Sequence, residues 1–516
     1  SGSGVYESSV DGESVMVADG IVSSISIGDA TITVYDSIMG CIGGDELSDH
    51  PEVLLDVKVD HSLKAPTQVG GGGQRGAALP AGDLNGDGFP DALLGIPWSN
   101  FGGVNSGAVF VYPGSQGGFD TEAVEAVYPP IKNGYFGREI ALGDVNGDGQ
   151  TDLVASSFKD DGEYGAVFLF HGVEDGFFEE EAAWSKPGDK DDDRLGTAVA
   201  LCDFNGDGWL DLAVGAEFAE DESSGIMIEV ESEEEEENAG EETEPVYELK
   251  VQEKQGLVQI FLGSETGFAE NPDQERFGAV YEEASWLPET NLYFGSSLIA
   301  GDFNHDNLCD LAVGARGYGA AEGNAEDGAI YLFVGTEDGL SESPAMGWAG
   351  MDPENKNSRF GQFGTAADVD NDGHIDLVTT AMYYDAEGKS NAGAVHIFLG
   401  SADLPDSFEM TADMDADWTG EGNGGNDLWG VWVQVADADG DGNPDILVGA
   451  QADEITGGTG GTGSIVIYEG QENTLPKTTS GRTVAGFATS DQFGKAFAAV
   501  EDLNGDGSAE ILSLAS

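Results

Sequence analysis

Basic residues are the scarcest charged class in this chain. Its 516 residues include only 19 Lys and Arg against 98 Asp and Glu, which gives a formal net charge of −79 at pH 7. Such a surface repels nucleic-acid phosphates and anionic lipids, so we expect neither as a partner. The same charge opposes compaction unless cations offset it. Because 40% of the residues are hydrophobic, we still expect a folded core rather than wholesale disorder.

Long apolar runs and cysteines are also scarce. No apolar run reaches the roughly 18 residues that a membrane-spanning helix requires, so we predict no membrane span. The three cysteines, Cys41, Cys202 and Cys309, are too few for a disulfide framework, and we interpret them as small buried apolar residues rather than reactive or paired ones. The chain begins at Ser1 with neither Met nor a signal-type apolar segment, and we expect a mature or trimmed product.

A nine-residue acidic pattern recurs along the chain. Its seven copies are DLNGDGFPD at 83, DVNGDGQTD at 144, DFNGDGWLD at 203, DFNHDNLCD at 302, DVDNDGHID at 368, DADGDGNPD at 437 and DLNGDGSAE at 502. Eight residues upstream of copies two to six stands an apolar residue followed by Gly, as in Phe136-Gly137 and Phe294-Gly295. Between copies lies a third signal of the type GAVFVYPG at 107. Repetition at this spacing is typical of an array of similar structural units.

The local pattern within each unit favours β structure. Short runs of Val, Ile, Phe and Tyr alternate with turns rich in Gly and Asp, and helical periodicity is scarce. Each unit provides strand A before the acidic loop, strand B after it, strand C of the GAVFVY type and a weaker strand D. Four short strands in seven copies predict an all-β, seven-bladed β-propeller of four-stranded blades.

The two ends of the chain are expected to complete one blade together. The chain stops just after strand B of copy seven, so we predict that residues 29–60 supply its missing strands, at 29–37 and 51–59. Residues 29–516 would then form the propeller, and residues 1–28 an N-terminal extension that could add a further strand. The competing interpretation is self-assembly, in which these N-terminal strands enter the blade of a neighbouring molecule.

The acidic loops place oxygen-bearing side chains at positions 1, 3, 5 and 9, a spacing that converges on one point in a tight turn. Ca²⁺ takes about six to eight oxygen ligands, so we predict up to seven Ca²⁺ sites that also use the carbonyl of position 7. The predicted ligands are Asp83, Asn85, Asp87, Phe89 and Asp91; Asp144, Asn146, Asp148, Gln150 and Asp152; Asp203, Asn205, Asp207, Trp209 and Asp211; Asp302, Asn304, Asp306, Leu308 and Asp310; Asp368, Asp370, Asp372, His374 and Asp376; Asp437, Asp439, Asp441, Asn443 and Asp445; and Asp502, Asn504, Asp506, Ser508 and Glu510.

Two alternatives to these calcium loops can be weighed on the sequence. An EF-hand requires Glu at position 12, where this chain has residues such as Leu94 and Val214, so a helix–loop–helix site is excluded. Asp, Asn and Gly also form turns without metal, but seven copies at one place relative to the strands favour a cation. Extracellular calcium modules bind at about 10⁻⁴–10⁻³ M, which predicts a secreted or cell-surface location.

These motifs resemble the FG-GAP repeats of integrin α subunits and related bacterial surface proteins. The resemblance covers roughly residues 70–516 and includes a third element, as in Gly95-Ile96-Pro97 and Gly314-Ala315-Arg316. Copies two, five and seven depart from that element, with Ser156-Ser157, Thr380-Ala381 and Leu514-Ala515. It implies the seven-bladed propeller and its calcium loops. Seven motif-bearing copies exceed the few usual in integrins, which suggests the bacterial type.

Aromatic residues in the B–C loops mark a candidate surface for a protein or glycan ligand. In a propeller of this kind the A–B loops lie on one face and the B–C loops on the other. The candidates are Trp98, Phe101, Phe158, Tyr164, Tyr318, Tyr383 and Tyr384, and the alternative is packing beneath the loops. Residues 219–255 form an acidic insertion, with fourteen Asp and Glu within 220–248, and we expect a solvated segment with a hairpin at each end.

Catalytic signals are absent from the sequence. The six histidines are scattered, and no G-x-S-x-G, H-E-x-x-H or phosphate-loop motif occurs. We therefore expect a non-enzymatic, extracellular calcium-binding propeller for surface adhesion or assembly of an extracellular structure. The rivals are a lectin-like carbohydrate-binding module and a polysaccharide-active enzyme propeller.

Overall fold

A computed structural model gives the fold. It describes residues 22–27, 30–35, 78–115, 125–129, 133–157, 164–174, 176–190, 193–220, 226–230, 246–250, 254–278, 291–319, 326–350, 357–386, 388–402, 409–411, 416–453, 461–476, 481–486, 492–500 and 509–515. Predicted features outside these residues are the strand at 51–59, most of the acidic loop of copy seven, and Phe158. The elements of the described residues are all strands, and no helix among them is long and apolar enough to cross a membrane.

One sheet illustrates the repeating unit. Strands β7 (Phe136–Gly143), β8 (Asp152–Ser157), β9 (Ala166–Phe170) and β10 (Trp184–Pro187) are antiparallel neighbours in the order β10-β9-β8-β7. The acidic loop of copy two joins β7 to β8, and the paired residues Gly143 and Asp152 close that hairpin. Every residue of β8 and β9 is buried, because DLVASS and AVFLF form the middle of a sheet that is covered on both faces. We call this sheet blade two, after its acidic copy.

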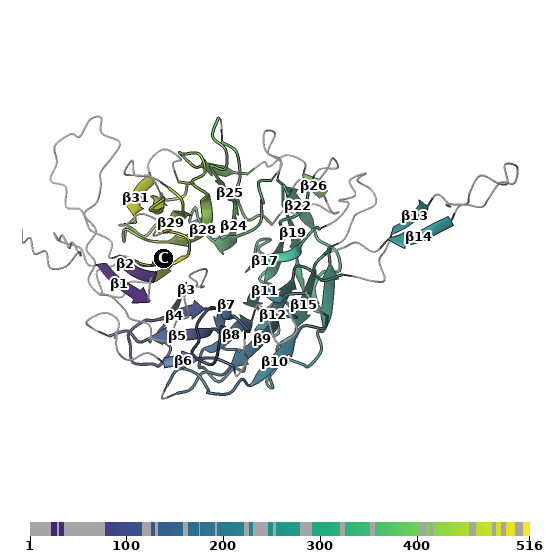
Figure 1. Cartoon of the computed structure of the whole chain (residues 1–516), viewed down its shortest axis with the longest axis horizontal. Coiled ribbons are helices and arrows are strands. Elements are labelled where there is room, and N and C mark those ends of the chain that lie inside the picture. The colour runs from purple at the N-terminus through teal and green to yellow at the C-terminus, as the bar shows by residue number, and fades with distance from the viewer. Residues whose placement is uncertain are drawn as a thin grey trace, which may run out of the picture.

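Five further sheets repeat this order, and together with blade two they form a β-propeller of four-stranded blades. Blade one contains β3 (Ala78–Gly82), β4 (Asp91–Ile96), β5 (Ala108–Tyr112) and β6 (Glu125–Val127); blade three β11 (Leu195–Cys202), β12 (Asp211–Ala216), β15 (Leu257–Phe261) and β16 (Gln274–Phe277); blade four β17 (Phe294–Gly301), β18 (Asp310–Ala315), β19 (Ala329–Phe333) and β22 (Met346–Ala349); blade five β23 (Gly364–Ala367), β24 (Asp376–Ala381), β25 (Ala394–Phe398) and β27 (Trp418–Glu421); blade six β28 (Trp429–Ala436), β29 (Asp445–Ala450), β30 (Ser464–Tyr468) and β31 (Gly481–Ala485). Figure 1 shows these sheets following one another around a common centre.

A sheet made from both ends of the chain lies beside blade one. Its order is β1-β2-β33-β32, with β1 (Val22–Ile27) and β2 (Ala30–Tyr35) joined to β33 (Glu510–Ala515) and β32 (Phe497–Val500), and Figure 1 marks the C-terminus beside β2. The strand paired with β2 is β1, and not residues 51–59 as the sequence suggested. Ile27 pairs with Ala30, and only two residues separate them in the sequence, so pairing with the upstream segment requires almost no loop closure.

The acidic insertion contains one described hairpin rather than one at each end. Strand β13 (Ile226–Val230) pairs antiparallel with β14 (Val246–Lys250), so the two predicted strands meet each other. Figure 1 shows this hairpin standing away from the blades. Two smaller features belong to blade four: the short pair β20 (Gly335–Thr336) and β21 (Gly339–Leu340), and β26 (Glu409–Thr411), which adds to β22 in parallel.

Backbone contacts between neighbouring blades explain the apolar–Gly pair and the later Gly of the repeat. A Cβ on Gly95 would overlap the carbonyl oxygen of Gly137, which belongs to the next blade. The same close backbone contact occurs between Gly215 and Gly295, between Gly314 and Gly361, and between Gly449 and Gly494. Where the later Gly is replaced, in copies two and five, the partner residues Gly196 and Gly430 are still present. Glycine is therefore favoured where two backbones meet between blades, and the Gly of the apolar–Gly pair also has a positive φ, as in Gly137 at 86°.

The apolar core lies between blades rather than at one centre. Phe136 is fully buried, and its ring packs edge-on against Phe168 and Phe170, with centroids 5.8 and 5.9 Å away. Its cluster includes Leu93 and Val109 of blade one, so β7 is held by both blades. Similar clusters lie between consecutive blades from blade two to blade six, which explains why strands B and C are apolar on both faces.

Two of the cysteines form a disulfide, which corrects their interpretation as unpaired apolar residues. Cys202 ends β11 of blade three, and Cys309 directly precedes β18 of blade four. They are 107 residues apart in sequence, but their Cα atoms are 6.1 Å apart. The backbone N–H of Cys309 also donates to the carbonyl of Asp203 at 3.2 Å, so adjacent blades bring together two positions that no local pattern connects. Cys41 lies outside the described residues.

Candidate metal centre

The acidic loops of blades one to six share one conformation. In copy one, Asp83 at position 1 accepts two backbone hydrogen bonds, from Asp87 N at 3.0 Å and from Gly88 N at 2.7 Å. The corresponding position-1 bonds in copies two to six measure 2.8–3.2 Å. A single carboxylate therefore fixes the turn, which is why the motif begins with Asp in every copy.

Positions 3 and 5 extend the same network. The side-chain oxygen of Asn85 accepts from Asp87 N at 2.9 Å, and a carboxylate oxygen of Asp87 accepts from Phe89 N at 2.9 Å. Equivalent bonds occur in the other five described loops. Oxygen side chains at alternate positions thus fold inward together, as their spacing predicts.

The carboxylate of position 9 has a structural role that the sequence did not indicate. Asp91 is fully buried at the start of β4; one oxygen accepts from Leu84 N at 2.8 Å and the other from Gly114 N at 2.8 Å. Leu84 belongs to the acidic loop, whereas Gly114 follows strand C, so this side chain ties three segments together. The equivalents Asp152, Asp211, Asp310, Asp376 and Asp445 make the same two bonds at 2.7–3.0 Å.

Burial of these position-9 carboxyls has an electrostatic cost. Desolvation raises the pKa of Asp310 and Asp445 to about 7 and that of Asp211 and Asp376 to about 6, against an ordinary value of 3.8. Backbone hydrogen bonds oppose the shift, and neighbouring loop carboxylates add to it. A cation near these oxygens would reverse this effect by favouring the ionised form.

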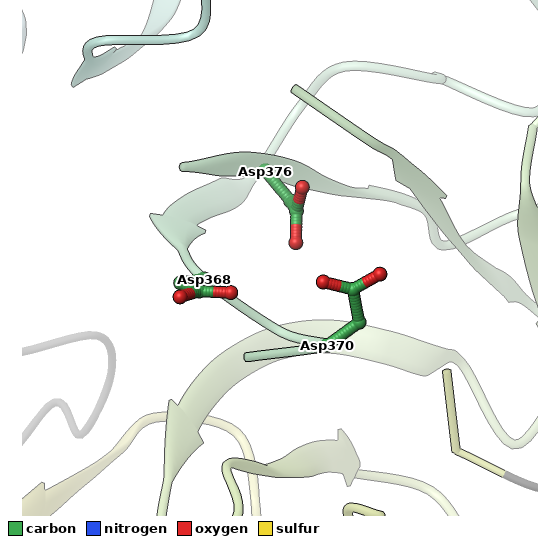
Figure 2. Close-up of side chains that lie close together, drawn as sticks. All are labelled: Asp368, Asp370 and Asp376. Carbon is green, nitrogen blue, oxygen red and sulfur yellow. The ribbon is translucent and has the colours of Figure 1, made fainter. Parts of the chain in front are cut away.

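Three carboxylates converge in each of two loops. In copy five, ligand atoms of Asp368, Asp370 and Asp376 lie within 4.8 Å of one another, and Figure 2 shows all three pointing into one space. Copy six brings together Asp437, Asp439 and Asp441 in the same way. These are the copies that have Asp rather than Asn at position 3. The donor set is oxygen only, which fits a hard cation such as Ca²⁺.

Few basic side chains compensate the described loops. Arg482 lies 2.7 Å from Asp439, His171 lies 3.2 Å from Asp152, and His374 lies 3.4 Å from Asp372. Each loop has three or four acidic side chains, so these three contacts compensate only a small part of the negative charge of the described loops. The loop geometry together with this excess of negative charge makes each loop a candidate cation site.

Copy four keeps the shared geometry despite its departures from the pattern. His305 and Asn307 replace the usual glycines and adopt left-handed backbone, with φ of 60° and 69°. Asp302 still accepts from Asn307 N at 2.9 Å. In copy seven, Glu510 begins β33, while Asp502, Asn504, Asp506 and Ser508 lie outside the described residues.

The predicted ligand-binding aromatics that the structure describes are half-buried, and those of blade one pack against rings from other segments. The Trp98 ring lies edge-on to Tyr135, with centroids 5.8 Å apart. Phe101 contacts Phe110 and Tyr128 at 5.7 and 5.1 Å. These contacts agree with the packing alternative, because each ring is already covered on part of its surface.

The other described aromatics of this set lie in separate blades. Tyr318 packs against the core between blades three and four, and Tyr384 against the core between blades four and five. Arg359 lies over the ring of Tyr383 at 5.0 Å, and the carbonyl of Tyr164 accepts from Leu195 N at 3.0 Å.

The same side of blades three to five has a chain of alternating charges that sequence reasoning missed. Glu217 contacts Arg194 at 3.4 Å and Arg316 at 2.9 Å, and Glu326 contacts Arg316 at 4.0 Å and Arg359 at 2.7 Å. The guanidinium of Arg194 lies 3.7 Å from the ring centroid of Phe218, and that of Arg316 lies 4.1 Å from that of Tyr293. Arg194 and Arg359 each directly precede an apolar–Gly pair, and this repeated position is the only sequence signal they share.

Comparison with known proteins identifies the class of this propeller. Models of the FG-GAP-like repeat match residues 83–155 and 144–214, and models of the FG-GAP repeat match residues 294–333 and 360–398. Each match begins at or near a feature described above, either an acidic loop or an apolar–Gly pair. The chain is therefore a β-propeller protein that contains FG-GAP repeats, as the sequence motifs predicted.

Its relatives include two kinds of protein. The chain is 31% identical over 229 residues to phosphatidylinositol-glycan-specific phospholipase D of Rattus norvegicus, covering 44% of this chain and 22% of the relative. It is 31% identical to integrin alpha-PS3 and 34% identical to integrin alpha-PS5 of Drosophila melanogaster, each over 205 residues; these cover 39% of this chain and 14% and 16% of the relatives. The matches thus span less than a quarter of each relative's length.

Solved structures similar to this chain include a rhamnogalacturonan lyase of Bacillus licheniformis and the Dos1 propeller. The first has a TM-score of 0.33 and 12% identity, and covers 83% of this chain and 71% of the lyase. The second has a TM-score of 0.35 and 10% identity, and covers 83% of this chain and 75% of that structure. At these values neither bears on function.

Proposed function

We propose that this chain is an exported, calcium-stabilised propeller that acts by non-enzymatic binding, in surface adhesion or in the assembly of an extracellular structure. The observation that carries the proposal is the identical oxygen-lined loop at the first hairpin of blades one to six. The disulfide between Cys202 and Cys309 supports export, because such bonds persist mainly in oxidising compartments. The partial similarity to integrin α chains supports a binding role.

Calcium suits these loops better than magnesium does. Ca²⁺ accepts six to eight oxygens in flexible geometry, whereas Mg²⁺ prefers a strict octahedron and retains several waters. Positions 1, 3, 5 and 9 with the position-7 carbonyl would hold one ion per loop, up to seven if the loop at 502–510 binds as well. Each bound ion would neutralise part of the excess negative charge that opposes compaction.

Thermal unfolding of the full chain tests the calcium proposal. Because an ion that binds only the folded state stabilises it by about 2.7 kcal/mol per site at 100 times its Kd, we expect the melting temperature to rise steeply with Ca²⁺. Calcium-free protein should unfold at a much lower temperature, and Mg²⁺ at equal concentration should restore less. Unchanged melting after exhaustive chelation would refute calcium stabilisation.

Seven blades closed by N-terminal strands are part of the proposal. The sheet β1-β2-β33-β32 has the strand order of the other blades, and β32 contacts both β28 of blade six and β3 of blade one. These contacts support closure of the ring by this sheet as the last blade. Self-assembly through the N-terminal strands is the alternative, in which β1 and β2 would come from a neighbouring molecule.

A cysteine pair distinguishes the two arrangements. Thr33 and Ser513 are paired across β2 and β33, so the double variant Thr33→Cys with Ser513→Cys should form a disulfide there. Closure within one chain predicts a cross-linked monomer on a denaturing gel, and exchange predicts dimers or longer species. Each single variant serves as the control for random cross-linking.

The partner remains a protein or glycan bound on the B–C loop face. A lectin-like module would require Trp98 or Tyr383 to contact sugar, so glycan-array binding that disappears in Trp98→Ala would favour that rival. A catalytic propeller would turn over a polysaccharide, which an assay of reducing-end or unsaturated products would detect. We propose neither activity, because the carboxylates that could serve catalysis are already used by the acidic loops.

A further inference from the structure

Neighbouring acidic loops touch at one repeated junction. Position 4 of one loop faces position 7 of the next: the Trp209 ring lies over Gly147, and the Leu308 side chain lies over Gly206. At the junction between copies five and six, Asn371 Nδ2 lies 3.2 Å from Asn443 Oδ1. The residues at position 4 of one loop and position 7 of the next are therefore in contact at these blade junctions, whether they are glycine, apolar or polar.

Two histidines meet at the junction between copies four and five. The rings of His305 and His374 have centroids 4.1 Å apart with an interplanar angle of 61°. They are two of only six histidines in the chain. His305 is exposed and adopts a left-handed φ of 60°, at a position where copies one, two, three, six and seven have Gly. Histidine is one of the few non-glycine residues that are enriched in this backbone conformation, and the exposed side chain of His305 does not pack in the core.

A carboxylate adjoins the pair. His374 Nδ1 lies 3.4 Å from Asp372 Oδ2, while Asp372 Oδ1 accepts from the backbone N–H of His374 at 2.8 Å. Asp372 therefore holds the imidazole of His374 beside the loop, while its carboxylate stays among the oxygen ligands predicted for the Ca²⁺ of copy five.

We propose that the imidazoles of His305 and His374 form a two-histidine site for a divalent transition-metal ion, with Zn²⁺ as the reference, that links the loops of copies four and five. Imidazole favours Zn²⁺, Ni²⁺ and Cu²⁺, whereas Ca²⁺ selects oxygen ligands, so this site differs in chemistry from the loops beside it. Water would complete the coordination. The ion would join blade four to blade five, next to the disulfide that joins blade three to blade four.

Titration of the full chain with Zn²⁺ in saturating Ca²⁺ tests this site, because Ca²⁺ then occupies any oxygen-only loop. The variants are His374→Gln and His305→Gly; the second introduces the glycine that five other loops have at this position and should fold. We expect each to weaken the tightest Zn²⁺ binding by at least about tenfold. The matched control is His171→Gln, a single loop-adjacent histidine beside Asp152, which should leave that affinity unchanged.

Electron paramagnetic resonance with Cu²⁺ in place of Zn²⁺ gives a readout independent of stability. The parent chain should show two nitrogen donors, and each variant of His305 or His374 only one. Unchanged Zn²⁺ affinity in both variants, an equal loss in His171→Gln, or displacement of Zn²⁺ by Ca²⁺ would overturn the proposal. None of these outcomes depends on whether Ca²⁺ stabilises the fold, so the two proposals fail separately.

Discussion

The two sets of loops in this propeller are built by different rules. At the hairpins between strands A and B, six described loops repeat the same hydrogen bonds with the same sequence positions. At the opposite ends of strand B the loops differ from blade to blade, with edge-on aromatic contacts in blade one and an Arg–Glu chain across blades three to five. Uniform loops are expected where a feature serves the fold in every blade, and variable ones where partners are recognised.

The largest effect is expected at the buried end of an acidic loop. Asp310→Ala leaves the N–H groups of Phe303, Asn304 and Gly335 without their acceptor inside the protein. Losses of about 1–3 kcal/mol per buried donor predict destabilisation of roughly 3–5 kcal/mol, even in calcium-free buffer. Urea unfolding monitored by Trp fluorescence would measure it.

The control for this prediction is Asp302→Ala in the same loop. Its N–H partners are exposed and can bond to water, so it should cost much less without Ca²⁺ and about as much as Asp310→Ala with Ca²⁺. Equal losses for the two variants in calcium-free buffer would contradict the separate anchoring role of position 9.

On the opposite side, the largest effect is expected at Glu217, whose side chain is only 5% exposed. Glu217→Gln removes the charge that compensates Arg194 and Arg316, and we expect a loss of about 2–4 kcal/mol. The loss should be the same with and without Ca²⁺, which distinguishes it from the loop variants. Glu326→Gln, with a side chain 30% exposed, should cost less, and an effect of Ca²⁺ on Glu217→Gln would show that the two sides are coupled.

The acidic loops should also make stability depend on pH in opposite ways with and without metal. In calcium-free protein, the pKa of Asp310 and Asp445 is about 7, above the ordinary 3.8, so their contribution is fully present below 3.8 and is lost as pH rises through 7. We expect a higher melting temperature at pH 5 than at pH 8 without Ca²⁺. Saturating Ca²⁺ requires the ionised forms and should reverse this order.

The double variant Asp310→Asn with Asp445→Asn serves as the control for the pH experiment, because it cannot titrate at these positions. Calorimetry in two buffers of different ionisation enthalpy should detect proton release when Ca²⁺ binds at pH 6.5. Binding without proton release would mean that these carboxyls are already ionised in the calcium-free protein.

The smallest effect is expected from single aromatics in the variable loops. Trp98→Ala removes one edge-on contact with Tyr135 and should cost about 1 kcal/mol. Asp87→Ala in the acidic loop of the same blade should cost little in calcium-free buffer but more in Ca²⁺. If Trp98→Ala instead leaves stability unchanged, its ring is available for a ligand, and the contrast between the two sides becomes sharper.

Local features of this protein followed from the sequence. The strand pattern, the acidic loops and the strand order within each blade depend on residues close together in the chain, where hydrophobic alternation and turn chemistry decide the structure. The convergence of Asp368, Asp370 and Asp376 follows in the same way, because these residues belong to one hairpin.

Contacts between blades were decided only by the tertiary structure. The sequence could not pair Cys202 with Cys309 or bring Glu217 together with its arginines. It also could not place β1, rather than residues 51–59, beside β2. Each of these contacts joins segments whose distance along the chain follows no fixed interval. The sequence also could not show that Asp91 anchors the segment after strand C, because its hydrogen-bond partner Gly114 lies 23 residues away. Local chemistry thus determined what each blade is made of, while packing around the ring determined which side chains meet.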